Sequence, residues 1–113
     1  METSKSQNNT SNDKHSQLNY EAVKKAAMIL RAINHKHRQQ IIKLLEENKR
    51  MKVTAIYVKL RLTQPIASQH LAVLRSARIL TFMREGQVIF YSLNYKRINE
   101  IDNYLNKFMH ESL

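Results

Sequence analysis

The spacing of apolar residues in this 113-residue chain changes from helical to strand-like near residue 78. Before that point apolar residues recur every three or four positions, as they do in amphipathic helices. After it, the runs 79–83 and 88–93 are short and rich in β-branched and aromatic residues, which is typical of strands. The only glycine, Gly86, lies between these runs, where a tight turn needs a positive φ. The pattern predicts a mainly helical chain with one β-hairpin.

The helical part divides into four segments, and a fifth helix follows the hairpin. Helices are predicted over 20–33, 35–47, 55–60, 63–77 and 95–109, with a short extended piece over 51–53. Side chains suited to N-capping precede four of them: Asn19, Asn34, Thr54 and Thr63. Pro65 falls in the first turn of the fourth helix, where its missing N–H costs nothing. The predicted fold is α+β, mainly α with a small β-hairpin, in the order α, α, short β, α, α, β, β, α.

The chain is long enough for one domain. Residues 1–17 are polar and rich in Ser, Asn and Thr, so they cannot bury enough apolar surface to offset the entropy of ordering. We therefore expect a disordered polar tail over 1–17 and a single folded domain over 18–113.

Composition excludes several classes of site. With no cysteine, the chain has no disulfide, thiolate metal site or cysteine nucleophile. A single glycine excludes the Gly-rich phosphate-binding loops, which need at least two. No catalytic grouping is visible, since Ser68 and His70 lie two apart on a predicted helix and so face different sides. The lack of such a grouping favours a protein that is not an enzyme. Short apolar runs and an N-terminus without a signal sequence favour a cytoplasmic location.

Positive charge is concentrated in one block. The net charge is +10, and residues 49–84 contain eight Lys and Arg with no Asp or Glu. The alternative is an ordinary solvated surface, but on such a surface positive and negative side chains would be evenly mixed. The block predicts a polyanionic partner.

The centre of this block has the pattern of a helix-turn-helix. A short helix, a tight turn at 61–63 and a longer helix are followed by the hairpin, which together predict a winged helix-turn-helix. The first turn of the second helix lies nearest the base edges in the DNA major groove. We expect base contacts from Gln64, Ser68 and Gln69, whose side chains both donate and accept hydrogen bonds. Backbone contacts are expected from Lys52, Lys59, Arg61, Thr63, Arg75, Arg78 and Arg84.

Residues 62–74, LTQPIASQHLAVL, resemble the recognition-helix signature of the ArsR/SmtB family of transcriptional repressors. The resemblance continues through residues 78–80, 84–87 and 90–93, includes 30–38 upstream, and covers about 18–110. It implies a homodimeric repressor that binds an inverted repeat of double-stranded DNA, with Arg84 and Gln87 of the wing on the backbone or minor groove. It also implies a dimer interface between the first and last helices, where the apolar stripes are Val23, Ala27, Leu30, Ile98, Ile101, Leu105 and Phe108.

The chain departs from the metal-sensing members of that family. Lys52, Val53 and Thr54 stand where some members have a Cys-X-Cys pair. The other family site corresponds here to Tyr95, Arg97, Phe108 and Glu111, of which three cannot bind zinc. His35 and His37, two apart, are not expected to chelate, and His70 is expected to be structural. We expect neither a metal site nor a cofactor, and the inducer is not indicated.

Two other functions share these features. A winged helix can bind an acidic protein through the same surface, and it can bind structured RNA. Selective loss of duplex recognition on changing Gln64 and Gln69 would separate DNA reading from both.

Overall fold

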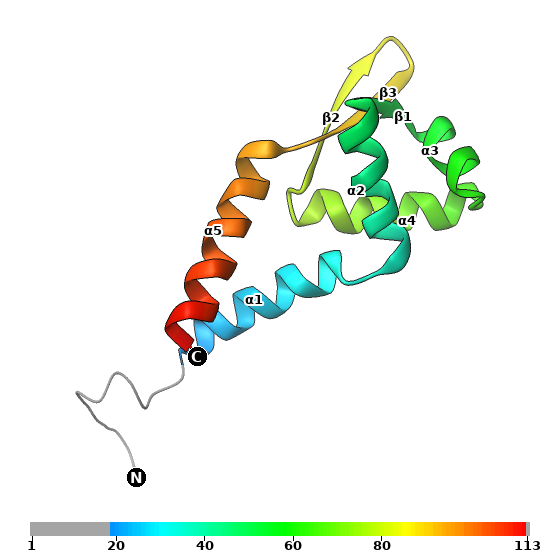
Figure 1. The fold of residues 1–113 in the computed structure, drawn as a ribbon. Helices are drawn as coiled ribbons and strands as arrows, with labels where there is room; N and C mark the ends of the chain where they lie inside the picture. The colour runs from blue at the N-terminus through cyan, green and yellow to red at the C-terminus, as the bar shows by residue number, and fades with distance from the viewer. Residues whose placement is uncertain (1–18, 113) are drawn as a thin grey trace.

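The computed structural model describes residues 19–112, so the predicted tail over 1–17 lies outside the described part (Figure 1). The described elements follow the predicted order. They are α1 (Tyr20–Ile33), α2 (Lys36–Asn48), β1 (Arg50–Lys52), α3 (Val53–Leu60), α4 (Gln64–Ser76), β2 (Leu80–Glu85), β3 (Val88–Leu93) and α5 (Tyr95–Ser112). No helix in this part of the chain is both long enough and apolar enough to cross a membrane.

The core forms where α2, α3 and α4 meet under the start of the hairpin. Its largest fully buried side chains are Ile41, Leu45, Ile56, Leu71, Leu74 and Ile79. All but Ile79, which precedes β2, come from the stripes at spacings of three and four that predicted the helices. Burying each such side chain contributes about 1.5–3 kcal/mol. Because the stripes of three helices converge on one cluster, the orientation of α4 is fixed by its buried side.

The hairpin belongs to a three-stranded antiparallel sheet with the order β1-β3-β2. The extended piece predicted over 51–53 is its edge strand, pairing Arg50 with Ser92 on β3. Glu85 pairs with Val88 across the turn, and Gly86 has a φ of 65°. The positive φ explains why the single glycine is placed there.

α1 and α5 come together at the end of the molecule away from the hairpin and diverge toward the core (Figure 1). The Tyr104 hydroxyl donates a hydrogen bond to the Ala22 carbonyl oxygen and ties the two helices together. α1 buries Ala26 and Ile29, as its apolar pattern predicts, and also Ala32. Ile33 is half-buried against the core, while Val23, Met28 and Leu30 are exposed. The broad apolar face of α1 is therefore only half used within one chain.

Two predicted caps are wrong, and Asn19 is confirmed. Asn34 ends α1 instead of starting α2, since its N–H donates to the Leu30 carbonyl oxygen at 2.7 Å. α2 begins one residue later, with His35 as its N-cap. α3 begins at Val53 after Lys52, so Thr54 is inside the helix. The chain passes directly from β1 into α3, which leaves no separate capping residue.

Candidate nucleic-acid interface

The turn between α3 and α4 is built by backbone hydrogen bonds. The Leu62 N–H donates to the Tyr57 carbonyl oxygen at 2.9 Å, and the Arg61 N–H donates to that of Val58 at 3.2 Å. These two bonds form a Schellman motif, with Arg61 in the left-handed conformation at φ 58° and ψ 42°. The motif ends α3 sharply, so that Thr63 can start α4 in an extended conformation. The predicted helix-turn-helix is thus present.

One side of α4 is buried and the opposite side is free. Ala67, Leu71 and Leu74 are almost completely buried against the other helices. Gln64, Ser68 and Gln69, the predicted base-contacting residues, are all exposed. Thr63 is the N-cap residue, but its side chain makes no capping hydrogen bond. The hydroxyl of Thr63 and the first-turn backbone N–H groups therefore retain donors that suit a phosphate.

Arginine occupies a second left-handed position at the other end of α4. Arg78 has a φ of 62°, and the bonds from Arg78 N–H to Arg75 and from Ile79 N–H to Leu74 repeat the Schellman pattern. Glycine is usual at such positions, because a side chain there costs roughly 1–2 kcal/mol. Arg61 and Arg78 place positive charge at both ends of α4 despite that cost.

The wing lies beside α4 with basic side chains on the near face. In the sheet register Phe82 and Arg84 share one face of β2, because side chains alternate along a strand. The Arg75 guanidinium of α4 stacks on the Phe82 ring, 4.0 Å from the ring centre. This contact links the recognition helix to the wing and orients Arg75. Arg84 therefore lies on the face of the wing that α4 contacts.

A residue of β1 outside the predicted set, Arg50, neutralises Glu85, the acid that directly follows the basic block. Its guanidinium donates to both Glu85 carboxylate oxygens, at 2.7 and 3.4 Å, and stacks on Phe90 at 4.1 Å. The hydrogen bond to Arg50 lowers the pKa of Glu85 and raises that of Arg50. The antiparallel register that brings the two together could not be read from the sequence, although both residues are charged and flank predicted strands.

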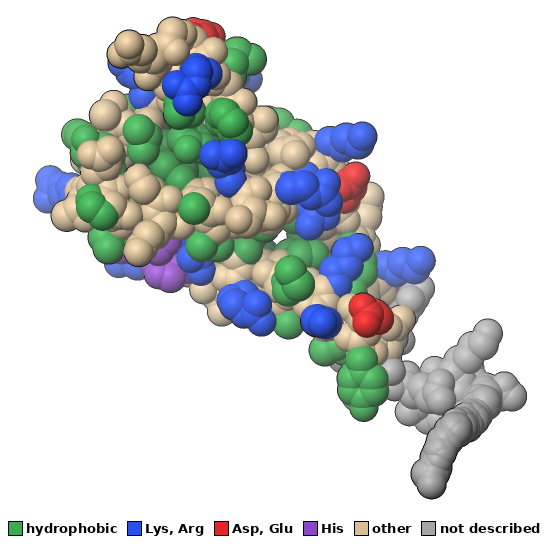
Figure 2. Space-filling model, turned by 180° about the vertical axis from the view of Figure 1, so that it is seen from behind, with side chains coloured by type: hydrophobic (Ala, Val, Ile, Leu, Met, Phe, Trp, Pro, Cys, Tyr) green, Lys and Arg blue, Asp and Glu red, His purple; other side chains and the backbone are tan. Residues whose placement is uncertain are grey.

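The side of the molecule that carries α4 is predominantly basic. In Figure 1 α2 crosses in front of α4, so the reverse view of Figure 2 shows the α4 side. Lys and Arg side chains are spread over it, with few acidic ones (Figure 2). Every predicted backbone-contacting residue is exposed: Lys52, Lys59, Arg61, Thr63, Arg75, Arg78, Arg84 and Gln87.

Three histidines meet where α2 begins beside α4, which corrects the expectation that His35 and His37 face apart. Because His35 precedes the helix, its ring lies 5.5 Å from that of His37 and 4.4 Å from that of His70. The His35 Nδ1 accepts from the His37 N–H at 3.0 Å, and the Arg38 Nη1 lies 3.5 Å from the His70 Nδ1. His70 is half-buried and packs here, as expected for a structural residue. Within residues 19–110 no three His, Asp or Glu side chains are placed to hold a metal ion.

This cluster lowers the pKa of His35 and that of His70. Burial, followed by the nearby Arg38 and His37, lowers the pKa of His35 below its usual value. Burial also lowers the pKa of His70, with His35 and Arg38 adding to it. Neither effect has a sequence signal beyond the two-residue spacing of His35 and His37. The contact with α4 depends on the tertiary fold.

Comparison with known proteins assigns the family. Residues 35–81 match the family model of the bacterial regulatory proteins of the arsR family. An uncharacterised HTH-type transcriptional regulator of Methanocaldococcus jannaschii, MJ1325, is 40% identical over 81 residues, covering 72% of this chain and 91% of that protein. The transcriptional repressor PagR of Bacillus anthracis is 33% identical over 89 residues, covering 79% of this chain and 89% of PagR.

Solved structures agree with this assignment. The PagR crystal structure has a TM-score of 0.60 at 33% identity and covers 74% of this chain and 97% of its own. The structure of reduced HlyU from Vibrio cholerae has a TM-score of 0.62 at 29% identity and covers 79% of this chain and 94% of its own. HlyU is named a transcriptional activator. The exposed helix-turn-helix, the basic wing and these relatives agree: the chain belongs to the ArsR family and is a winged-helix, DNA-binding transcriptional regulator, not an enzyme.

Proposed function

We propose that the chain recognises a specific DNA duplex through the first turn of α4. The observation that carries the proposal is the exposure of Gln64, Ser68 and Gln69 in the first half of α4, while Ala67 of the same stretch is buried. A glutamine side chain can donate to and accept from adenine at once, and a good bidentate pair contributes about 1–3 kcal/mol of discrimination. If the N-terminal half of α4 enters the major groove, these three side chains reach the base edges.

The backbone contacts come from the exposed polar and basic residues around α4. Lys52, Lys59, Arg61 and Thr63 flank its start, and Arg75 and Arg78 flank its end. Arg84 and Gln87 extend the contact through the wing. These contacts hold the duplex in register without reading sequence. Because the proposed partner is chromosomal DNA, we place the protein in the cytoplasm.

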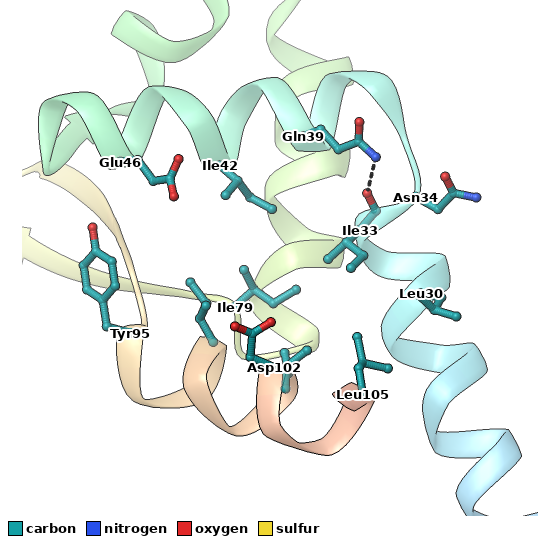
Figure 3. Close-up of a pocket in the computed structure, with 12 residues that line it drawn as sticks. Leu30, Ile33, Asn34, Gln39, Ile42, Glu46, Ile79, Tyr95, Asp102 and Leu105 are labelled. Atoms are coloured by element: carbon teal, nitrogen blue, oxygen red, sulfur yellow. Dashed lines mark hydrogen bonds between the residues drawn. The ribbon is translucent and has the colours of Figure 1, made fainter. Parts of the chain in front are cut away.

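The protein acts as a homodimer that pairs through α1 and α5. Val23 and Leu30 are 40% and 47% exposed, and Ala27 lies between them on the same face of α1. Leu30 also lines a cavity of about 540 Å³ between α1, α2 and α5, together with Ile98 and Leu105. Figure 3 shows Leu30 and Leu105 at this cavity. A second copy would cover this apolar surface, which a single chain leaves open.

The contribution of α5 to this interface is narrower than its apolar stripe predicts. Ile101 is 7% exposed and packs in the core of its own chain, so it offers little surface to a partner. Ile98, Leu105 and Phe108 are half-buried and keep part of their surface free. Two-fold symmetry would place the two α4 helices on an inverted repeat. A dimer bound there would repress by excluding polymerase.

Selection of bound duplexes from a random pool tests the proposal. The full-length protein should enrich an inverted repeat, and its affinity should fall steeply with salt because each neutralised phosphate releases about 0.9 counterion. Failure to enrich any duplex would contradict the proposal. Capture of an acidic protein instead would support an interaction module, and preference for structured RNA in competition would support an RNA-binding role.

A further inference from the structure

We propose that the groove between α1 and α4 binds a small organic acid with an apolar body. The groove encloses about 540 Å³, within the range of roughly 300–1,000 Å³ typical of small-molecule sites. Figure 2 faces this side, where the surface is hollowed between α4 and α1. The groove is separate from the first turn of α4, because the α4 residues that line it belong to the second half of the helix.

The walls of the groove are aliphatic. α1 contributes Met28, Ile29 and Ala32, and α4 and its C-cap contribute Ala72, Val73 and Ala77. Met28 is 58% exposed and Val73 37% exposed, so both helices leave apolar surface uncovered at this place. A hydrocarbon or aromatic body would release water from that surface, which is the main favourable term in such binding.

Charge determines which end group fits. The lining includes Arg31, Arg38 and Arg97 but no carboxylate, and an acid beside these groups, Glu100, has its Oε1 3.8 Å from the Arg97 Nη1. The Arg38 Nη2 donates to the Arg31 carbonyl oxygen at 3.0 Å, and the Arg97 Nε donates to that of Ala77 at 3.0 Å. These bonds anchor two guanidinium groups to the ends of α1 and α4. Guanidinium forks match carboxylates, so anchored arginines beside an apolar wall select an amphiphilic anion over a neutral or cationic one.

Arg38 has donor capacity that the chain itself does not use. Its Nε is buried and has no hydrogen-bond partner among the described residues. A buried donor without an acceptor costs about 1–3 kcal/mol. Its Nη1 is only 3.5 Å from the His70 Nδ1, at the limit of a hydrogen bond. An anion in the groove that accepts a hydrogen bond from this guanidinium would therefore use donor capacity that the chain leaves unsatisfied.

The groove stays accessible in the proposed dimer. Successive residues turn by 100° around a helix, so Met28 lies on a different side of α1 from Val23 and Leu30, while Arg31 lies at the edge of that face, one turn from Ala27. The groove and the proposed dimer face therefore adjoin at Arg31, and the apolar wall at Met28 lies away from the dimer face. Because α4 forms one wall, an occupant contacts the recognition helix directly.

Calorimetric titration of the full-length protein with octanoate tests the site. Octanol and octylammonium serve as matched probes with the same hydrocarbon body. We expect saturable binding of octanoate, with the other two at least tenfold weaker. Equal binding of the three probes, or no saturable binding of octanoate, would overturn the proposal.

A pair of matched variants places the binding. Val73→Asp puts a carboxylate in the groove wall, and Val58→Asp makes the same change on α3, where Val58 is 68% exposed. Like charges placed together are repulsive, so Val73→Asp should weaken octanoate binding by at least about tenfold. Val58→Asp should leave it unchanged. Equal loss in both variants, or full binding by a folded Val73→Asp protein, would place the ligand elsewhere.

An effect of the acid on DNA binding rests on the proposed function. Saturating octanoate should change the affinity for the selected duplex, and the change should be absent in Val73→Asp. Because the calorimetric titration uses protein without DNA, it decides the site even if no duplex is recognised. Octanoate binding with unchanged DNA affinity would overturn the coupling but not the site.

Discussion

At the scale of single residues, the clearest functional signal is arginine where local backbone energetics favour glycine. Arg61 and Arg78 both adopt positive φ at the Schellman ends of α3 and α4. The only glycine of the chain is used in the wing turn instead. Positive charge at both ends of α4 thus takes precedence over the preferred residue, which agrees with contacts to phosphate.

Replacing Arg61 by Asn tests the role of its positive charge without disturbing the left-handed backbone conformation. Asn tolerates the left-handed conformation better than most residues, so the melting temperature should not fall. Loss of one phosphate contact should reduce the slope of log affinity against log salt by about 0.9. Fluorescence anisotropy with a selected duplex at several salt concentrations measures the slope. An unchanged slope would show that Arg61 does not contact the backbone, and Lys24→Asn on exposed α1 provides the control.

At the scale of elements, the start of α2 carries a pH-sensitive cap. The His35 Nδ1 must be unprotonated to accept from the His37 N–H, and the pKa of His35 and that of His70 are lowered. The folded state therefore disfavours protonation relative to the unfolded chain. Stability should be full above the ordinary histidine pKa of about 6.5 and should decrease as the pH falls toward the lowered folded values.

Urea unfolding at pH 7.5 and pH 5.0 measures this loss. His35→Asn keeps an acceptor at the N-cap but removes the titrating ring, so its stability should depend less on pH than that of the parent. If the variant loses as much stability between the two pH values as the parent does, His35 is not a source of the effect.

The wing turn gives a second test at this scale. An added Cβ at Gly86 would meet nothing within 4 Å, so the cost of Gly86→Ala comes from its φ of 65° alone. The free energy of unfolding should fall by about 1 kcal/mol. Gly86→Asn should cost less, because Asn adopts positive φ more readily. Equal stability of Gly86→Ala and the parent would contradict the turn geometry.

The sequence predicts elements better than it predicts the contacts between them. The spacing of Ala67, Leu71 and Leu74 is enough to define the buried side of α4, and therefore the exposed side. By contrast, Arg50 and Glu85 pair through a strand register that depends on the whole sheet. Ile101 belongs to the apolar stripe of α5 but is buried in the core of its own chain. The spacing of a stripe cannot show whether its residues contact the core or a partner. The histidine cluster likewise needs α2 and α4 in place.

For the whole molecule, the proposed dimer is the feature that would place two α4 helices on one duplex. Leu30→Lys puts charge on the proposed interface at an exposed position, so the chain should fold but sediment with the mass of one copy. Met28→Lys makes the same change on another side of α1 and should leave the dimer intact. Analytical ultracentrifugation distinguishes the two. A dimeric Leu30→Lys protein would exclude this face of α1 from the interface.

The most direct test of the account concerns the first turn of α4. The double variant Gln64→Ala and Gln69→Ala should keep the melting temperature, because both side chains are exposed. Asn103→Ala with Asn106→Ala, on exposed positions of α5, is the matched control. The measurement is the ratio of affinities for the selected duplex and a scrambled one. We predict that this ratio falls at least tenfold in the α4 variant only, and an unchanged ratio would contradict base reading by α4.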